Sequence, residues 1–131
     1  MFCLSESDTF YLYPYPTDMR KSFYSLSGIV ANEMRRSIQD GDAFVFVNRS
    51  LDSMKILHAE FGGLVIYNLK LEKGRISLPD AVFDGEGEVA VPHLLEWSQL
   101  VLMIQGISPS DVRRKPRWIP QEKGVKISLK I

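Results

Sequence analysis

Two cations that follow a short motif are the first residues with a candidate chemical role. Residues 16–23 read Pro-Thr-Asp-Met-Arg-Lys-Ser-Phe, and the pattern places Arg20 and Lys21 in the first turn of a helix. The partial positive charge of a helix N-terminus favours acids at that position, so a negatively charged ligand would offset the cost of two cations. Free backbone N–H groups together with both side chains would form an anion site. In the alternative, both side chains extend into solvent and contact carboxylates such as Asp18.

A second group of cations lies near the end of the chain, next to an indole. Residues 113–118 place Arg113, Arg114, Lys115 and Arg117 beside Trp118. Cations bind phosphates, and an indole ring stacks on a base or a ribose, so these residues are candidates for nucleic-acid contact. The alternative is a basic surface strip whose tryptophan packs onto the body of the protein.

The distribution of charge supports a polyanionic partner. The chain of 131 residues has a formal net charge of zero. Residues 112–131 hold seven basic residues and one acid, a net charge of +6, whereas residues 1–111 carry −6. Such asymmetry indicates either a polyanionic partner or a basic tail that folds back onto the acidic body.

The sequence shows few signs of catalysis or of a bound cofactor. His58 and His93 are 35 residues apart without a cysteine nearby, which argues against a zinc site. We expect His58 half-buried on a strand and His93 in the first turn of a helix. Residues 84–88 are acidic but lack the order of a calcium loop, and no nucleotide-binding glycine loop or nucleophile elbow is present. We therefore predict a protein that is not an enzyme and has no cofactor.

The composition predicts a cytoplasmic protein. Cys3 is the single cysteine, so no internal disulfide framework is expected and a reducing, intracellular compartment is favoured. No apolar run approaches the roughly 20 residues that span a bilayer, so no membrane partner is expected. Glu6 and Asp8, without a basic region before them, argue against a signal peptide.

The hydrophobic pattern predicts an α+β fold. Apolar residues at helical spacing predict a first helix over about residues 18–38: Met19, Phe23, Leu26, Val30 and Met34. Residues 43–47 are almost wholly apolar, as in a central strand covered on both faces. Residues 9–13, 54–59, 64–71 and 76–78 read as further strands, and their short connections predict an antiparallel meander. A second helix is expected over about 93–105, opened by Pro92 and closed by Gly106.

These elements predict a single domain with two parts. Residues 1–111 form the α+β body, with both helices packed on the sheet, and residues 112–131 form a basic C-terminal segment. Residues 125–131 alternate apolar and polar side chains, which predicts an added strand at a sheet edge of this chain or of a neighbour. The pattern leaves the oligomeric state open.

Several motifs in order resemble the signature of one bacterial family. They comprise residues 16–23, residues 42–49 (Asp-Ala-Phe-Val-Phe-Val-Asn-Arg), residues 55–57 (Lys-Ile-Leu), Gly63-Leu64, Tyr67, residues 70–74 (Lys-Leu-Glu-Lys-Gly) and Pro79. Together they resemble the small accessory protein (second open reading frame, TnpB-type) of the insertion-sequence sixty-six family of bacterial transposable elements. The resemblance covers roughly residues 2–106.

The resemblance implies a role in transposition without catalysis. Such proteins are encoded beside a DDE-type transposase, are thought to assist transposition and DNA recombination, and are not recognised as enzymes. DNA and the transposase of the same element are the implied partners. The positions that match the basic part of the motif are Arg20, Lys21, Arg49, Lys55, Lys70 and Lys73.

Two functional hypotheses follow from the resemblance, and one departure of this sequence from the family pattern bears on them. Relatives tend to be basic, often with further cations after the Asn-Arg pair, whereas residues 50–53 here read Ser-Leu-Asp-Ser. The first hypothesis is a non-enzymatic accessory protein that contacts DNA, the transposase or both. The second is a protein–protein docking module without direct nucleic-acid binding. A third possibility, a small-anion or nucleotide-binding enzyme, is supported only by the residues at the start of the first helix.

Overall fold

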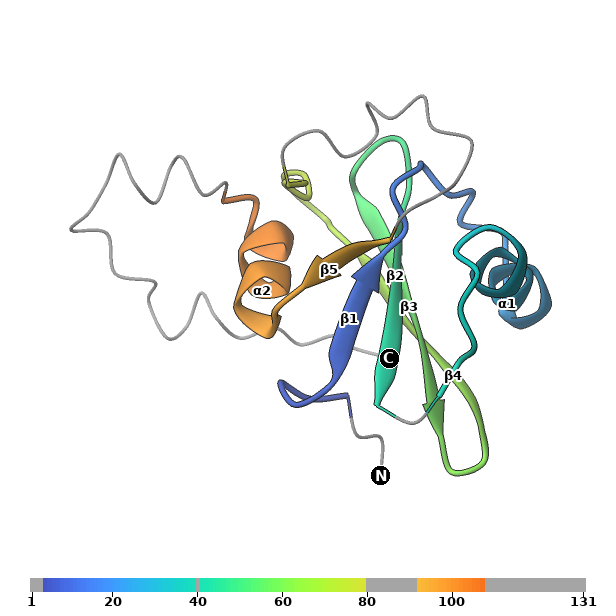
Figure 1. Ribbon diagram of the computed structural model, residues 1–131. Helices are drawn as coiled ribbons and strands as arrows, with labels where there is room; N and C mark the ends of the chain where they lie inside the picture. The colour runs from blue at the N-terminus through green and yellow to red at the C-terminus, as the bar shows by residue number, and fades with distance from the viewer. Residues whose placement is uncertain (1–3, 40, 80–91, 108–131) are drawn as a thin grey trace.

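One five-stranded sheet organises the protein. The structure, a computed structural model, describes residues 4–39, 41–79 and 92–107. The strands lie in the order β4-β3-β2-β1-β5 (Figure 1). Their bounds are β1 Thr9–Leu12, β2 Asp42–Val47, β3 Ser53–Glu60, β4 Gly63–Lys70 and β5 His93–Leu95.

The pairing is mostly antiparallel. β2, β3 and β4 form a meander, and β5 pairs antiparallel with β1. β1 and β2 are parallel, which differs from the predicted all-antiparallel meander. The reason is the connection between them, because it contains the first helix and returns the chain to the end of the sheet where it began.

The two helices cover opposite faces of the sheet (Figure 1). Helix α1, Phe23–Asn32, lies on one face and helix α2, Trp97–Gln105, on the other. The α1 side of the core includes Leu26, Val30, Phe44, Phe46 and Leu57. The α2 side includes Phe10, Leu12, Val45, Ile56, Leu100 and Met103.

The predicted fold class is confirmed, as a single α+β domain with two helices on a mostly antiparallel sheet. The prediction for residues 43–47 is also confirmed, because each of them is fully buried. A strand with side chains buried on both faces must be apolar throughout, and this one is. The predicted division at residue 111, the added strand at 125–131 and the five tail candidates fall outside the described residues.

Helix α1 is shorter than the predicted helix over 18–38. The side chain of Asp18 accepts a hydrogen bond from Arg20 N at 2.9 Å, and the carbonyl of Asp18 accepts one from Lys21 N at 3.1 Å. An aspartate that binds nearby backbone N–H groups stabilises a turn in place of a helix. The N-cap is therefore Ser22, and neither Thr17 nor Asp18 takes that position. At the other end Arg35 has a φ of 55°, a left-handed conformation that does not continue a helix.

The second helix also begins later than predicted. His93 lies in β5, and the helix starts at Trp97 behind a capping box in which Glu96 and Gln99 satisfy each other's backbone N–H. Gly106 ends it with a φ of 75°, as predicted. A Cβ at this position would lie 2.8 Å from the carbonyl oxygen of Arg75, so a larger residue is excluded by space as well as by backbone conformation.

Residues 76–78 do not form the predicted strand. Ile76 is buried and its N–H donates to the Leu51 carbonyl at 2.6 Å, so the segment is an irregular stretch fixed to the β2–β3 turn. Gly28 lies within α1 and does not pack closely against a strand. A Cβ there would meet only the Asn32 side chain, at 3.9 Å.

Candidate nucleic-acid interface

Six of the sequence-predicted contact residues are described, and the structure brings all six to one end of the sheet. This end lies where β2 and β4 finish and β3 begins, at the β2–β3 turn near the top of Figure 1. We call it the basic end. Its cations are Arg20, Lys21, Arg49, Lys55, Lys70, Lys73 and, in addition, Arg75.

The loop that carries the Arg20 motif is fixed to this end by the backbone. Tyr13 N donates to Val45 O and Thr17 N donates to Val47 O, each at 2.9 Å, so the chain continues beside β2 after β1 has ended. Pro14 and Pro16, which have no N–H, occupy positions between these donors. The loop thus meets the turn after β2 around a hollow of about 380 Å³. Its lining residues are Pro16, Thr17, Asp18, Met19, Asn48 and Arg49.

Arg20 is paired with Asp18. Its Nε lies 3.1 and 3.0 Å from the two carboxylate oxygens of Asp18, and its Nη2 lies 2.6 Å from Oδ2. The hydrogen bonds from the Arg20 side chain and backbone lower the pKa of Asp18 to about 2. The second of the two sequence interpretations therefore holds for Arg20, because its guanidinium is paired with a carboxylate of the same turn. The Arg20 side chain is nevertheless 91% exposed.

Lys55 fixes the start of α1 over β3. Its Nζ donates to the carbonyl oxygen of Lys21 at 2.8 Å. The contact joins residues that are far apart in the sequence and places Lys21, directly before the N-cap, at the basic end. Lys55 therefore has a structural role as well as a charge, whereas the Lys21 side chain makes no ion pair with any described residue.

Asn48 shapes the turn that presents Arg49. Its Oδ1 accepts hydrogen bonds from Asp52 N and Ser53 N, both at 3.1 Å, and its Nδ2 donates to Asp52 Oδ1 at 2.6 Å. An asparagine side chain is suited to close such a turn, because it offers a donor and an acceptor together. Arg49 is held on the exposed side of the turn and, among the described residues, has no acidic partner.

The chain after β4 adds the remaining cations. Lys70 Nζ donates to Asp52 Oδ2 at 2.7 Å, and this bond is the main cause that lowers the pKa of Asp52 to about 2. Leu71 N donates to Asp52 O at 2.8 Å, which holds the segment with Lys73 and Arg75 at the same end. Arg75 is exposed and was missed by the sequence prediction, although its place directly after Lys73-Gly74 was a usable signal.

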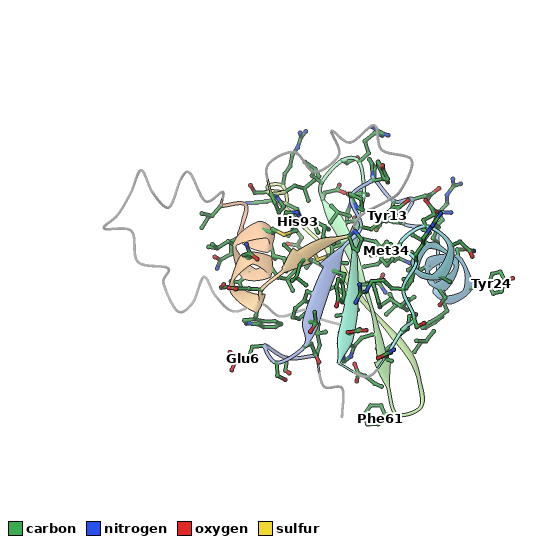
Figure 2. All side chains as sticks on the ribbon, in the orientation of Figure 1. Glu6, Tyr13, Tyr24, Met34, Phe61 and His93 are labelled. Carbon is green, nitrogen blue, oxygen red and sulfur yellow. The ribbon has the colours of Figure 1, made fainter. Side chains whose placement is uncertain are left out.

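The opposite end of the sheet is acidic. It holds Glu6, Asp8, Asp42, Glu60 and Glu96, and Figure 2 places Glu6 and Phe61 together at this lower end. A cleft of about 490 Å³ opens there, with Glu6, Asp8, Glu96, Leu94 and Trp97 in its lining. Two arginines flank this end on the α1 side. One of them, Arg36, donates to Tyr11 OH at 2.8 Å and lies 4.0 Å above the Tyr11 ring, so its role is structural.

Sequence reasoning missed a buried polar network near the acidic end. His58 was predicted to be half-buried, but its side chain is only 2% exposed. Its Nδ1 lies 2.8 Å from Glu60 Oε2 and its Nε2 lies 3.3 Å from Asp8 Oδ1, and Tyr67 OH donates to Glu60 Oε2 at 2.5 Å. His58 and Glu60 are two residues apart on one strand, so their shared face was predictable. The approach of Asp8 was not, because it comes from the turn before β1.

Two other features are absent from the described residues. No group of three or more His, Cys, Asp or Glu side chains within them is arranged to hold a metal ion. Nor is any helix in the described ranges long and apolar enough to cross a membrane.

Comparison with known proteins identifies the family. The family described as "IS66 Orf2 like protein" matches residues 8–114. The chain belongs to the IS66 Orf2-like family. The match covers both motifs that meet at the hollow of the basic end, and it confirms the resemblance inferred from those motifs. The family is associated with transposition.

A relative supports this membership. It is "Uncharacterized protein y4hO" of Sinorhizobium fredii (strain NBRC 101917 / NGR234), which is 32% identical over 110 residues. The alignment covers 82% of this chain and 86% of the relative. No solved structure matches the chain.

Proposed function

We propose that this IS66 Orf2-like protein is a non-enzymatic accessory factor of DNA transposition that binds DNA phosphates through its basic end. One observation carries the proposal: cations from four separate stretches of the sequence converge on one end of the sheet. Two of the seven, Arg20 and Lys70, are paired with Asp18 and Asp52. The other five make no ion pair with a described residue. An excess of positive charge on one surface is the electrostatic footprint of a polyanion partner.

The tail candidates extend this proposal. Arg113, Arg114, Lys115, Arg117 and Trp118 belong to the segment with a net charge of +6. In the proposed complex they add phosphate contacts and a stacking ring to those of the basic end.

The test is DNA binding by variants at the two ends of the sheet. The full chain is titrated against a labelled duplex of the element's terminal repeat, followed by fluorescence anisotropy. Arg49→Glu, at the basic end, should weaken binding strongly. Arg35→Glu, an exposed arginine after α1, is the matched control and should change it little. Equal loss in both variants, or no binding by the unaltered chain, would contradict a localised DNA surface.

A second candidate function is docking to the transposase without DNA contact. The cleft at the acidic end favours it, because acidic groups there surround the exposed Leu94 and partly buried Trp97, a combination suited to a basic, apolar segment of another protein. A pull-down with the transposase separates the two functions. Glu6→Lys should abolish capture if docking uses the cleft, whereas the double variant Arg20→Ala/Lys21→Ala should retain it. The reverse pattern would remove the basis of the docking function.

A further inference from the structure

Two aromatic rings lie exposed at the start of α1. Tyr24 is 94% exposed and Phe23 is 46% exposed. Figure 2 shows Tyr24 on the outer side of α1, pointing away from the body. Among the described residues the Tyr24 ring makes no ring contact and its hydroxyl makes no hydrogen bond. Large aromatic side chains normally contribute to a core or an interface, and Tyr24 is not part of the core.

The surroundings of these rings are positive. Arg20 and Lys21 directly precede the N-cap, and the first turn of α1 contains no acid. The Ser22 side chain makes no capping hydrogen bond, so the N-terminal N–H groups add the positive end of the helix dipole. The contact from Lys55 to the Lys21 carbonyl holds this helix start at the basic end.

Aromatic rings beside cations match the chemistry of an unpaired nucleotide. Bases stack on exposed aromatic side chains while cations hold the phosphates on either side. Within a duplex the faces of each base are covered by its neighbours, so a ring that projects from a helix stacks on an unpaired base but not on a base inside a duplex. An apolar protein partner fits less well, because the rings are flanked by Arg20, Ser22 and the exposed Ser25 in place of a contiguous apolar patch.

We propose that Tyr24, with Phe23 beside it, stacks on an unpaired base of DNA whose phosphates are held by the basic end. This inference rests on the proposed function and adds the class of substrate: single-stranded DNA, or a duplex with a single-stranded end, is bound in preference to a closed duplex. Tyr24 supplies the base contact and the adjacent cations supply the phosphate contacts.

The experiment uses the full chain and three labelled probes: a single strand of roughly 20 nucleotides, a blunt duplex and the same duplex with a single-stranded overhang. Stacking on one base is worth about tenfold in affinity. Tyr24→Ala should therefore weaken binding to the single strand and the overhang about tenfold and leave blunt-duplex binding unchanged. Tyr24→Phe should bind normally, because the ring is kept. Phe61→Ala, which removes an exposed ring at the opposite end of the sheet, is the control and should have no effect.

Three outcomes would overturn the inference in distinguishable ways. If the unaltered chain binds the blunt duplex as tightly as the overhang, the preference is refuted while the proposed function stands. If Tyr24→Ala weakens all three probes equally, or none, stacking on an unpaired base is refuted. If the unaltered chain binds no probe, this inference and the proposed function fail together. Because Tyr24 is exposed, circular dichroism should show an unchanged fold in every variant.

Discussion

The salt dependence of DNA binding provides a quantitative test of the basic end. Of its seven cations, Arg20 and Lys70 are held by carboxylates, and Lys55 donates to the Lys21 carbonyl. Four remain available to phosphates: Lys21, Arg49, Lys73 and Arg75. Each phosphate neutralised on duplex DNA contributes about −0.9 to the slope of log K against log salt, so these four predict a contribution of about −3.6. Between about 50 and 200 mM salt this contribution lowers the affinity about 150-fold.

The change caused by one substitution is more informative than the total slope, because the proposed contacts of the basic tail would add to that total. Arg49→Ala should reduce the magnitude of the slope by about 0.9, and Lys73→Ala should do the same. Arg35→Ala, the matched control, should leave the slope unchanged. Affinity is measured by fluorescence anisotropy at four or more salt concentrations, in the full chain. If Arg49→Ala lowers affinity without changing the slope, Arg49 does not neutralise a phosphate and the reasoning is refuted.

Three further predictions concern hydrogen bonds at and around the sheet. Asp18→Asn should strengthen DNA binding in the same anisotropy assay, because it releases the exposed Arg20 from an ion pair, and unchanged or weaker binding would contradict this. Tyr67→Phe should lower the free energy of unfolding in urea by about 2 kcal/mol, because buried Glu60 loses a donor, and a loss below about 0.5 kcal/mol would contradict it. Burial, and then a hydrogen bond to a carboxylate, raise the pKa of Tyr13 above its usual value of about 10. The stabilisation from Tyr13 is therefore complete below pH ~10 and is lost as the pH rises through the higher folded-state value. The stability advantage over Tyr13→Phe, measured by urea denaturation, should thus shrink above pH ~10, and a constant difference would refute the assignment.

Much of the fold was predictable because local patterns and tertiary packing agree. The apolar run at 43–47 belongs to a strand covered on both faces, and Gly106 closes α2 at a position where a Cβ would clash with the Arg75 carbonyl oxygen. The start of α1 was not predictable from periodicity. Met19 fits the apolar stripe and packs on the core, yet the turn closed by Asp18 keeps it outside the helix. A hydrophobic stripe shows which side chains are buried, but a competing side-chain hydrogen bond decides where the helix begins.

The candidate site was predictable in its residue types but not in its arrangement. The motif named Arg20 and Arg49 as candidate contact residues, but their place at one end of the sheet depends on the parallel β1–β2 pair, which brings the ends of both strands to that end. An antiparallel pair would place the end of β1 beside the start of β2. The buried contact between His58 and Asp8 was not predictable either, because it depends on where the turn before β1 places Asp8.

The net charge of the body is a poor guide to its ability to bind DNA. Six of the fifteen acids in residues 1–111 lie outside the described residues, and the described residues carry nine acidic and nine basic side chains. Most of these cations are at one end and most of the acids at the other. β3 has eight residues, which at about 3.4 Å each separates the two ends by roughly 27 Å. At physiological salt, charges are screened over about 8 Å, so the acidic end does little to cancel the field of the basic end. A neutral domain can therefore present an electropositive surface to DNA and, at the same time, an acidic cleft to a protein, and the two proposed contacts need not exclude each other.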